Sequence, residues 1–384
     1  MKYLKLIIFA GFAIRLLYAA RIGFQGAADG LDMDAEGFYI RMVIIARSGI
    51  FEAMQVGEPL VLNTIGTLMG LFGDGVFVGC LFSCLAWLVS GLFFSKSVAL
   101  TDANDSLKMM AVTLYSFWPT GIPYTTITLR EPYQLMFVSI ALYAALALFR
   151  SRNALYWPLL AFGLIGTGAL HGGLAAFGIA MFILTMIFYS FFGGSKFPLV
   201  QVLFATVLAF IIGYFGFLNS GALGLNIDSG VIESAQSYQG GGIANYGRTN
   251  YKEEVASITG LDALFFVPIG LFQYLFEPMP WKISTSSDIV LFVENLTRLA
   301  IILLAIVELV KSPKHPQRTL LFFLISAYFA QEMLWSLGTV NWGTASRHHV
   351  PAMGLLILTG LQALFLRNHR LMAPRQITSA ARAA

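Results

Sequence analysis

The chain has 384 residues, of which 57% are hydrophobic and only 11% are charged, and its mean hydropathy is +0.74. This composition excludes a soluble globular domain and indicates that lipid is the main solvent of the fold. The net charge of +4 follows from the way charges divide across a membrane, and it does not indicate a nucleic-acid partner.

The hydropathy pattern predicts an all-α fold, a polytopic membrane bundle that forms a single transmembrane domain over residues 1–384. Apolar runs of about 20 residues are long enough to cross roughly 30 Å of hydrocarbon, and two of the runs found here are shorter. We expect about ten transmembrane helices, at residues 4–22, 75–97, 109–129, 132–149, 155–170, 172–192, 198–218, 288–310, 319–338 and 350–366.

Basic residues collect on one side of this arrangement and acidic residues on the other. The basic stretches 150–152, 311–318 and 367–382 fall on the same side as Lys2 and Lys5. By the positive-inside rule this side is cytoplasmic. Ionisable residues are costly near a membrane unless they build a site, so we expect the functional site on the opposite, outer face.

Two outer segments are long. In the first, residues 25–74, the stretch 38–50 has apolar residues at helical spacing and the stretch 59–72 is apolar but too short to span, so both predict interfacial helices. The second, residues 219–287, is rich in glycine near Gln239, which is typical of a mobile cover.

Asp32, Asp34 and Glu36 form a DxDxE string directly after the first span. Three carboxylates in five residues repel one another, so such a string is costly unless it binds a cation, takes up a proton or orients a sugar hydroxyl. The alternative is an acidic cap at the start of the amphipathic helix, which the helix dipole favours.

Arg130 and Glu131 stand at the outer end of the third predicted span, just before Pro132. They are consistent with an ion pair that marks a helix end, with Pro132 in the first turn of the next helix. They are equally consistent with a site in which Arg130 grips a phosphate through two parallel hydrogen bonds and Glu131 orients it or binds sugar hydroxyls.

Histidines and a further arginine occur at other outer turns. Arg347 and His348 precede the last span, where they predict either a phosphate site or interfacial packing by snorkelling side chains. Because adjacent histidines on a helix diverge by about 100°, His348 and His349 do not predict a metal site. His171 lies at another outer turn and is a weaker candidate.

Two more features lie on or near the outer face. Lys282 follows two prolines and a tryptophan, which is typical of an interface anchor and also compatible with a phosphate contact. Glu294 and Arg298 are four residues apart within the next span and predict an ion pair hidden from lipid.

Together these residues bring carboxylates and phosphate-binding bases to one face from five separate stretches of chain. This combination suits a reaction in which a carboxylate deprotonates a hydroxyl that attacks a sugar, while Arg and Lys stabilise charge on a departing lipid phosphate. The residues predict Asp32, Asp34 and Glu36 as catalytic, and they predict a substrate-binding set of Arg130, Glu131, His171, Lys282, Arg347 and His348. The reaction needs no cofactor, and the sequence shows no spacing typical of metal ligands. Whether a divalent metal ion takes part is left open by the sequence.

Short motifs of the chain resemble membrane glycosyltransferases of the GT-C superfamily and related bacterial polysaccharide-assembly proteins. They are the acidic string, the runs 57–60 to 71–74 and 117–119 to 129–131, and the stretch 347–351 before the final span. The resemblance implies a helical bundle with interfacial helices in the first periplasmic loop and a donor sugar carried on polyprenyl phosphate or diphosphate. It also implies an essential first-loop acid, which is Asp34 first and Asp32 next. Many relatives carry His before two prolines where this chain has Gly57-Glu58-Pro59.

The resulting hypothesis is a glycosyltransferase of the bacterial inner membrane whose active site faces the periplasm and serves cell-surface polysaccharide or glycoconjugate assembly. Its partners would be a polyprenyl-linked sugar donor, membrane lipid and a glycan, lipid or protein acceptor. One alternative is an O-antigen-type polymerase that joins lipid-linked oligosaccharides. A second alternative is a lipid or solute transporter, which would place ionisable groups at mid-membrane and break helices in matched halves.

Overall fold

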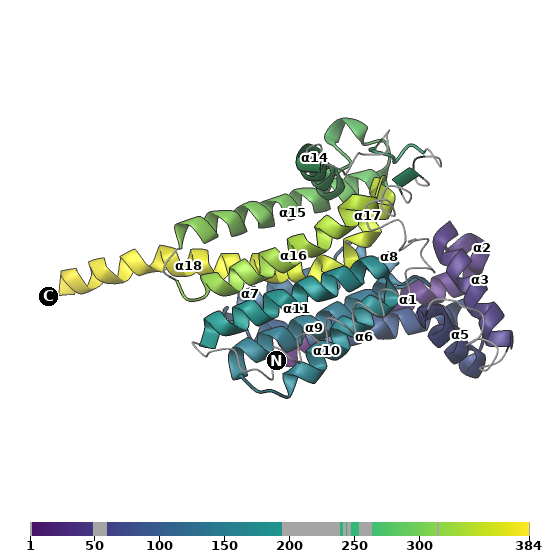
Figure 1. Cartoon of the computed structure of the whole chain (residues 1–384), viewed down its shortest axis with the longest axis horizontal. Coiled ribbons are helices and arrows are strands. Elements are labelled where there is room, and N and C mark those ends of the chain that lie inside the picture. Colours follow the sequence, from purple (N-terminus) through teal and green to yellow (C-terminus); the bar gives the residue numbers. More distant parts are fainter. Residues whose placement is uncertain are drawn as a thin grey trace.

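The computed structural model is an elongated bundle whose longest helices run along a common direction (Figure 1). The structure describes residues 2–48, 60–193, 239–240, 243, 247–252, 263–312 and 315–383. Within these ranges seven helices are long and apolar enough to cross a membrane. They are α1 (Lys2–Gln25), α6 (Val76–Ala99), α9 (Glu131–Ser151), α11 (Gly172–Gly193), α15 (Ser286–Lys311), α16 (Arg318–Gly338) and the run formed by α17 (Trp342–His348), the 3-10 helix η5 (Val350–Ala352) and α18 (Met353–Ala383).

The all-α class is confirmed, and seven of the ten predicted spans are long helices in the described part of the chain. The predicted span 155–170 is the shorter helix α10 (Tyr156–Leu170), and the predicted span 198–218 lies outside the described residues. The predicted continuous span 109–129 is wrong. Its residues form α7 (Asp105–Ser116), an interruption, and a single turn α8 (Gly121–Tyr124).

Proline explains the interruption. Pro119 has no N–H to donate to the ladder and its ring excludes the helical conformation at Trp118, so the helix ends before them. The backbone groups freed in this way lie among apolar helices, where they must find partners within the protein.

Two charged side chains supply these partners. Arg15 of α1 is fully buried and donates to the carbonyl of Ser116 at 2.9 Å and to the hydroxyl of Thr125 at 2.7 Å. Glu294 of α15 accepts from the N–H of Thr120 at 2.8 Å and from its hydroxyl at 2.7 Å. A cation thus meets the carboxyl end of α7 and an anion meets the amino end of α8, as helix dipoles favour.

The ion pair predicted between Glu294 and Arg298 is wrong. Glu294 is engaged by Thr120. Arg298 donates to the carbonyl of Leu275 at 2.8 Å and to the side chain of Asn295. Both residues serve the backbone of neighbouring segments because those segments are irregular and need donors and acceptors.

The first outer loop contains the two helices expected from its pattern, α3 (Met33–Ser48) and α5 (Leu60–Phe72), after the short helix α2 (Ala27–Gly30). They pack against each other closely, because a Cβ atom added to Gly66 would lie 2.7 Å from Ile45. At 13 residues, α5 is too short to span a membrane. Figure 1 shows these helices beyond one end of the long bundle. The motif residues 57–59 lie outside the described part of the chain.

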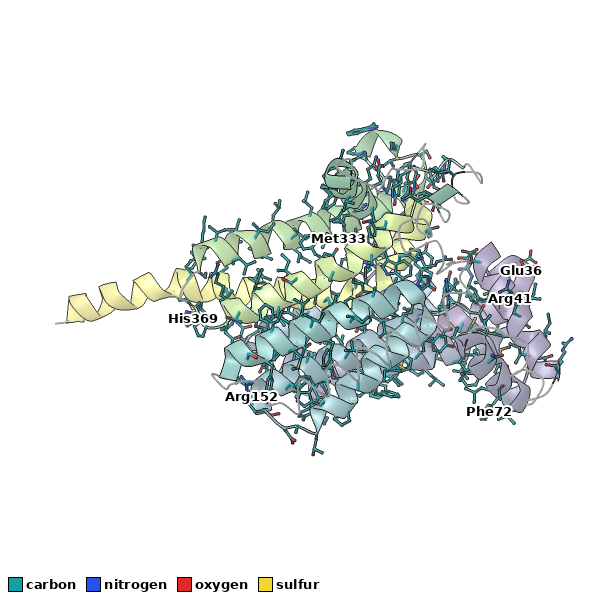
Figure 2. The ribbon with its side chains drawn as sticks, in the orientation of Figure 1. Glu36, Arg41, Phe72, Arg152, Met333 and His369 are labelled. Atoms are coloured by element: carbon teal, nitrogen blue, oxygen red, sulfur yellow. The ribbon has the colours of Figure 1, made fainter. Side chains whose placement is uncertain are left out.

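Charged loops mark the two ends of the bundle. Arg152 and His369 lie toward one end, whereas Glu36, Arg41 and Phe72 lie at the other (Figure 2). This separation agrees with the predicted inner and outer sides, and we call the end that carries Glu36 the outer end after that prediction.

The outer end also holds α14 (Ala263–Phe276) and the 3-10 turn η4 (Pro280–Lys282). The short segment 247–252 docks there on the connection between α16 and α17. The N–H of Tyr251 donates to the carbonyl of Val340 at 2.9 Å, and the N–H of Trp342 donates to Thr249 at 3.1 Å. The rest of the predicted cover around Gln239 lies mostly outside the described residues, apart from 239–240 and 243.

Small residues and shared hydrogen bonds hold the bundle core. A Cβ atom on Gly163 of α10 would lie 2.7 Å from the backbone nitrogen of Ala141, so α10 and α9 are in close contact there. Ser90 of α6 bonds both Tyr115 and Ser139, at 2.5 and 2.8 Å. Such small-residue contacts and interhelical hydrogen bonds are the usual means of packing helices in lipid.

Candidate functional site

Arg347 is the centre of an ionic cluster at the outer end of the bundle. It lies in the last turn of α17, a helix whose first turn is capped by the side chain of Asn341. Its Nη1 lies 2.5 Å from Oδ2 of Asp34, and its Nε lies 3.0 Å from Oε1 of Glu131. Three residues far apart in the sequence therefore form one cluster, which we call the outer triad: Asp34, Glu131 and Arg347.

The two carboxylates of the outer triad have different surroundings. The side chain of Glu131 is only 2% exposed, whereas that of Asp34 is 61% exposed. The second oxygen of Glu131, Oε2, is buried without a hydrogen-bond partner in the described part of the chain. Arg347 thus has one fixed partner inside the protein and one at the surface that a ligand could replace.

The other two acids of the DxDxE string are Asp32 and Glu36, and their surroundings differ from those of Asp34. The side chain of Asp32 accepts from the N–H of Ala35 at 2.8 Å, so it caps α3 as the acidic-cap alternative proposed. Thr128 donates to the carbonyl of Ala35 at 2.7 Å and fixes this cap to the interrupted span. Glu36 is half-buried and lies at the outer edge of α3 in Figure 2. The structure therefore brings Asp34, rather than Glu36, to Arg347.

Arg130 borders the outer triad from the turn before α9. Its guanidinium carbon lies 5.2 Å from the ring centre of Phe38 in α3, a cation–π arrangement. Its charge acts on both His171 and His348. Arg130 therefore belongs to the same neighbourhood as the two histidines predicted with it.

His171 and His348 both contact the ring of Trp335. The ring of Trp335 lies 4.6 Å from that of His171 and 3.9 Å from that of His348. Burial lowers the pKa of His171 well below its ordinary value, and the charge of Arg130 lowers this pKa further. His171 is therefore neutral, and its Nδ1 accepts from the N–H of Gly173 at 3.1 Å.

Lys282 makes its ion pair elsewhere. Its Nζ lies 2.7 Å from Oε1 of Glu277, whose other oxygen accepts from the N–H of Met279 at 2.9 Å. Trp281 beside it is 78% exposed. This arrangement fits the interface-anchor alternative better than a phosphate contact.

Sequence reasoning missed several residues at this end. Tyr124 and Ser346 share a hydrogen bond of 3.1 Å beside the outer triad. Arg248 forms an ion pair of 2.7 Å with Asp288, which sits in a capping box at the start of α15. The Thr-x-x-Asp spacing before an apolar run could have revealed the capping box, whereas nothing in the sequence indicates the distant partner Arg248.

The outer triad and Arg130 place guanidinium donors and carboxylate acceptors together at the outer end. Among the described residues no group of three or more His, Cys, Asp or Glu side chains is placed to hold a metal ion.

Fold and composition together define a polytopic helical membrane protein. No protein-family model, no curated protein and no solved structure matches the chain.

Proposed function

We propose that the protein is a glycosyltransferase that takes its sugar from a polyprenyl phosphate or diphosphate at the outer face of a bacterial inner membrane. The observation that carries this proposal is the contact of Asp34, from the first outer loop, with Arg347 and Glu131. The interfacial helices α3 and α5 agree with the GT-C-like layout that the motifs imply. The cell-surface glycan pathway and the periplasmic orientation rest on the positive-inside rule and on that resemblance.

The chemistry assigned to the outer triad is a displacement at the anomeric carbon. Asp34 takes the proton of the acceptor hydroxyl, and the acceptor oxygen forms a bond to the anomeric carbon. The bond from that carbon to the phosphate oxygen breaks, and its electron pair stays on the departing phosphate. Arg347 and Arg130 stabilise the negative charge that develops there.

Substrate binding would also activate the base. In the ligand-free protein the Asp34 carboxylate is held in an ion pair with Arg347. A donor phosphate that binds Arg347 displaces the exposed Asp34 and leaves Glu131 in place. Asp34 is then free to act as base only when a donor is present. The acceptor hydroxyl is therefore not deprotonated in the absence of a donor.

Glu131 would hold the sugar. Its buried oxygen Oε2 lacks a partner among the described residues, and buried polar atoms of this kind are normally paired. A sugar hydroxyl that donates to this oxygen would satisfy it and place the anomeric carbon next to Asp34.

The test is mass spectrometry of polyprenyl-linked glycans from cells that lack the gene. The cells are complemented with wild type, with Asp34→Asn, or with the matched control Asp29→Asn, which removes an exposed carboxylate of the same loop. We expect a lipid carrying one sugar to accumulate and to be cleared by wild type and Asp29→Asn only. Clearance by Asp34→Asn would show that Asp34 is not the base.

The O-antigen-type polymerase gives a different result in the same experiment. Such an enzyme would leave a complete lipid-linked oligosaccharide repeat rather than a single-sugar lipid.

Transport is the second candidate function, and one observation favours it. A span is interrupted between Ser116 and Gly121, and Arg298 and Glu332 are buried near the interruption. Discontinuous helices with ionisable groups at depth are typical of transporter sites. No change in any lipid-linked glycan, together with uptake or flipping of lipid by the purified protein in vesicles, would support this candidate over the enzyme.

A further inference from the structure

A small cavity, lined in part by ionisable side chains, lies at the interrupted span and is separate from the outer triad. Its volume is about 10 Å³, close to what one water molecule needs. Trp118 and Thr120 at the interruption form one wall, and the ionisable side chains Arg298, Glu332 and His349 form the others. Glu332 lies six residues before the outer end of α16, which places it about 9 Å below that end.

Glu332 is completely buried and only partly satisfied. Its Oε2 lies 2.7 Å from Nδ1 of His349. Its Oε1 is buried without a hydrogen-bond partner in the described part of the chain. A buried carboxylate oxygen without a donor is costly, so it indicates a bound water or a proton.

The second nitrogen of His349 determines the proton count. Nε2 lies 3.2 Å from the carbonyl oxygen of Tyr274. A carbonyl can only accept, so Nε2 must carry a hydrogen in this contact. In a neutral imidazole Nδ1 would then be an acceptor, and it faces Oε2 of Glu332, which in a carboxylate is also an acceptor. The 2.7 Å contact between them is a hydrogen bond only when one further proton is present on either partner.

Charged and titratable side chains of the neighbouring helices surround Glu332 and His349. Arg298 of α15, Tyr274 of α14 and Tyr328 of α16 act on Glu332 or on His349. Glu294 of α15 lines a neighbouring hollow together with Arg298 and His349, and it is bound to Thr120. From η5 and α18, Val350, Met353 and Leu356 add apolar walls. Arg298 is therefore the cation that balances the pair when it is deprotonated.

We propose that Glu332 and His349 form a proton-binding site that holds one exchangeable proton inside the bundle. A hydronium ion in the cavity transfers its proton to the pair and leaves a water molecule, and the reverse step releases the proton to that water. The protonated pair is either a neutral acid with a neutral imidazole or a carboxylate with an imidazolium, and both have zero net charge. Loss of the proton leaves one negative charge beside Arg298.

A second hollow, too narrow for a water molecule, adjoins this site. It is lined by Glu277, Asn295, Trp342 and Ser346, and it shares Arg298 and His349 with the first cavity. Glu277 pairs with the partly exposed Lys282. Polar side chains therefore extend from the site to the pair of Glu277 and Lys282, and Asp34 is not among them.

Infrared difference spectra of the purified protein across the pH range in which it stays folded, in H₂O and in D₂O, test this proposal. We expect one proton to leave the pair, seen as loss of a protonated-carboxyl band or of imidazolium ring bands, with a shift in D₂O. In Glu332→Gln the amide can donate to Nδ1 of His349, so the contact is kept without the extra proton and the signal disappears. The matched control Glu294→Gln, which removes another buried carboxylate, retains the signal.

Retention of the titrating signal in Glu332→Gln, or its absence from wild type, would overturn the proposal. Should Glu332→Gln fail to fold, nitrogen-15 spectra of wild type with labelled histidine give the answer directly. At the acid end of that pH range we expect His349 to show Nε2 protonated and Nδ1 in a strong hydrogen bond to Glu332. A His349 with Nε2 unprotonated would contradict the proton count.

Discussion

Arg15 is predicted to stabilise the interrupted span from inside the membrane. Its guanidinium makes two long-range hydrogen bonds, to Ser116 and Thr125, and lies 3.7 Å from the ring centre of Trp87. No carboxylate pairs with it among the described residues. We consider Arg15→Met, which keeps an unbranched side chain and leaves the Ser116 carbonyl without its donor.

The expected loss can be worked from these contacts. Hydrogen bonds between membrane helices contribute about 0.6–1.7 kcal/mol each, and a desolvated cation over tryptophan contributes about 2 kcal/mol. The loss of these contacts is partly offset, because the variant no longer has to desolvate a buried charge when it folds. We therefore expect Arg15→Met to lower the free energy of unfolding by about 2–4 kcal/mol.

Equilibrium unfolding in mixed micelles measures this effect. The matched control is Arg21→Met, which removes an exposed arginine of the same helix and should change stability by less than about 0.5 kcal/mol. Equal stability of the two variants would refute the view that Arg15 caps the end of α7.

Three further predictions concern the outer end and the topology. Glu131→Gln leaves Arg347 without its buried anion and should lower the free energy of unfolding by about 3 kcal/mol. The control Glu36→Gln, at a half-buried residue, should change it little. Equal decreases in the free energy of unfolding of the two variants would contradict the ionic cluster. Burial lowers the pKa of Lys252 from 10.5 to about 8, so the unfolded chain binds more protons between these values and stability should rise with pH across that window. Lys252→Met should remove this rise and stabilise the protein near pH 7 by about 3 kcal/mol, and a rise that persists in thermal unfolding of the variant would exclude Lys252 as its source. Cysteines introduced at Asn153 and Asp29 should react with impermeant thiol reagents from the inner and outer sides respectively, and outer labelling of Asn153 would overturn the orientation.

Hydropathy predicted most of the bundle because helix length and apolarity are local properties of the sequence. The helices α1, α6, α15 and α16 begin and end within a few residues of the expected spans. The interruption before Gly121 was missed because an apolar run looks the same whether or not a proline breaks it. The signal was present in Pro119, but its effect depends on partners as remote as Arg15 and Glu294.

The candidate site was partly predictable. The positive-inside rule put Asp34, Glu131 and Arg347 on one face, and the structure brings them into contact. Sidedness carries no information about lateral position within the membrane plane. It therefore could not show that Lys282, which pairs with Glu277, lies apart from the outer triad. It also could not predict the contact between Glu332 and His349, because nothing local links residues of two different helices.

Binding of a polyprenyl phosphate to the purified protein tests the central claim most directly. If phosphate replaces Asp34 on Arg347, Asp34→Asn should bind up to about five-fold more tightly, because it removes an exposed competing carboxylate worth about 1 kcal/mol. Arg347→Gln should bind at least about 30-fold more weakly, because it removes a charged phosphate contact worth about 2 kcal/mol or more. Native mass spectrometry or calorimetry provides both dissociation constants. Weaker binding by Asp34→Asn, or unchanged binding by Arg347→Gln, would contradict a phosphate site at the outer triad.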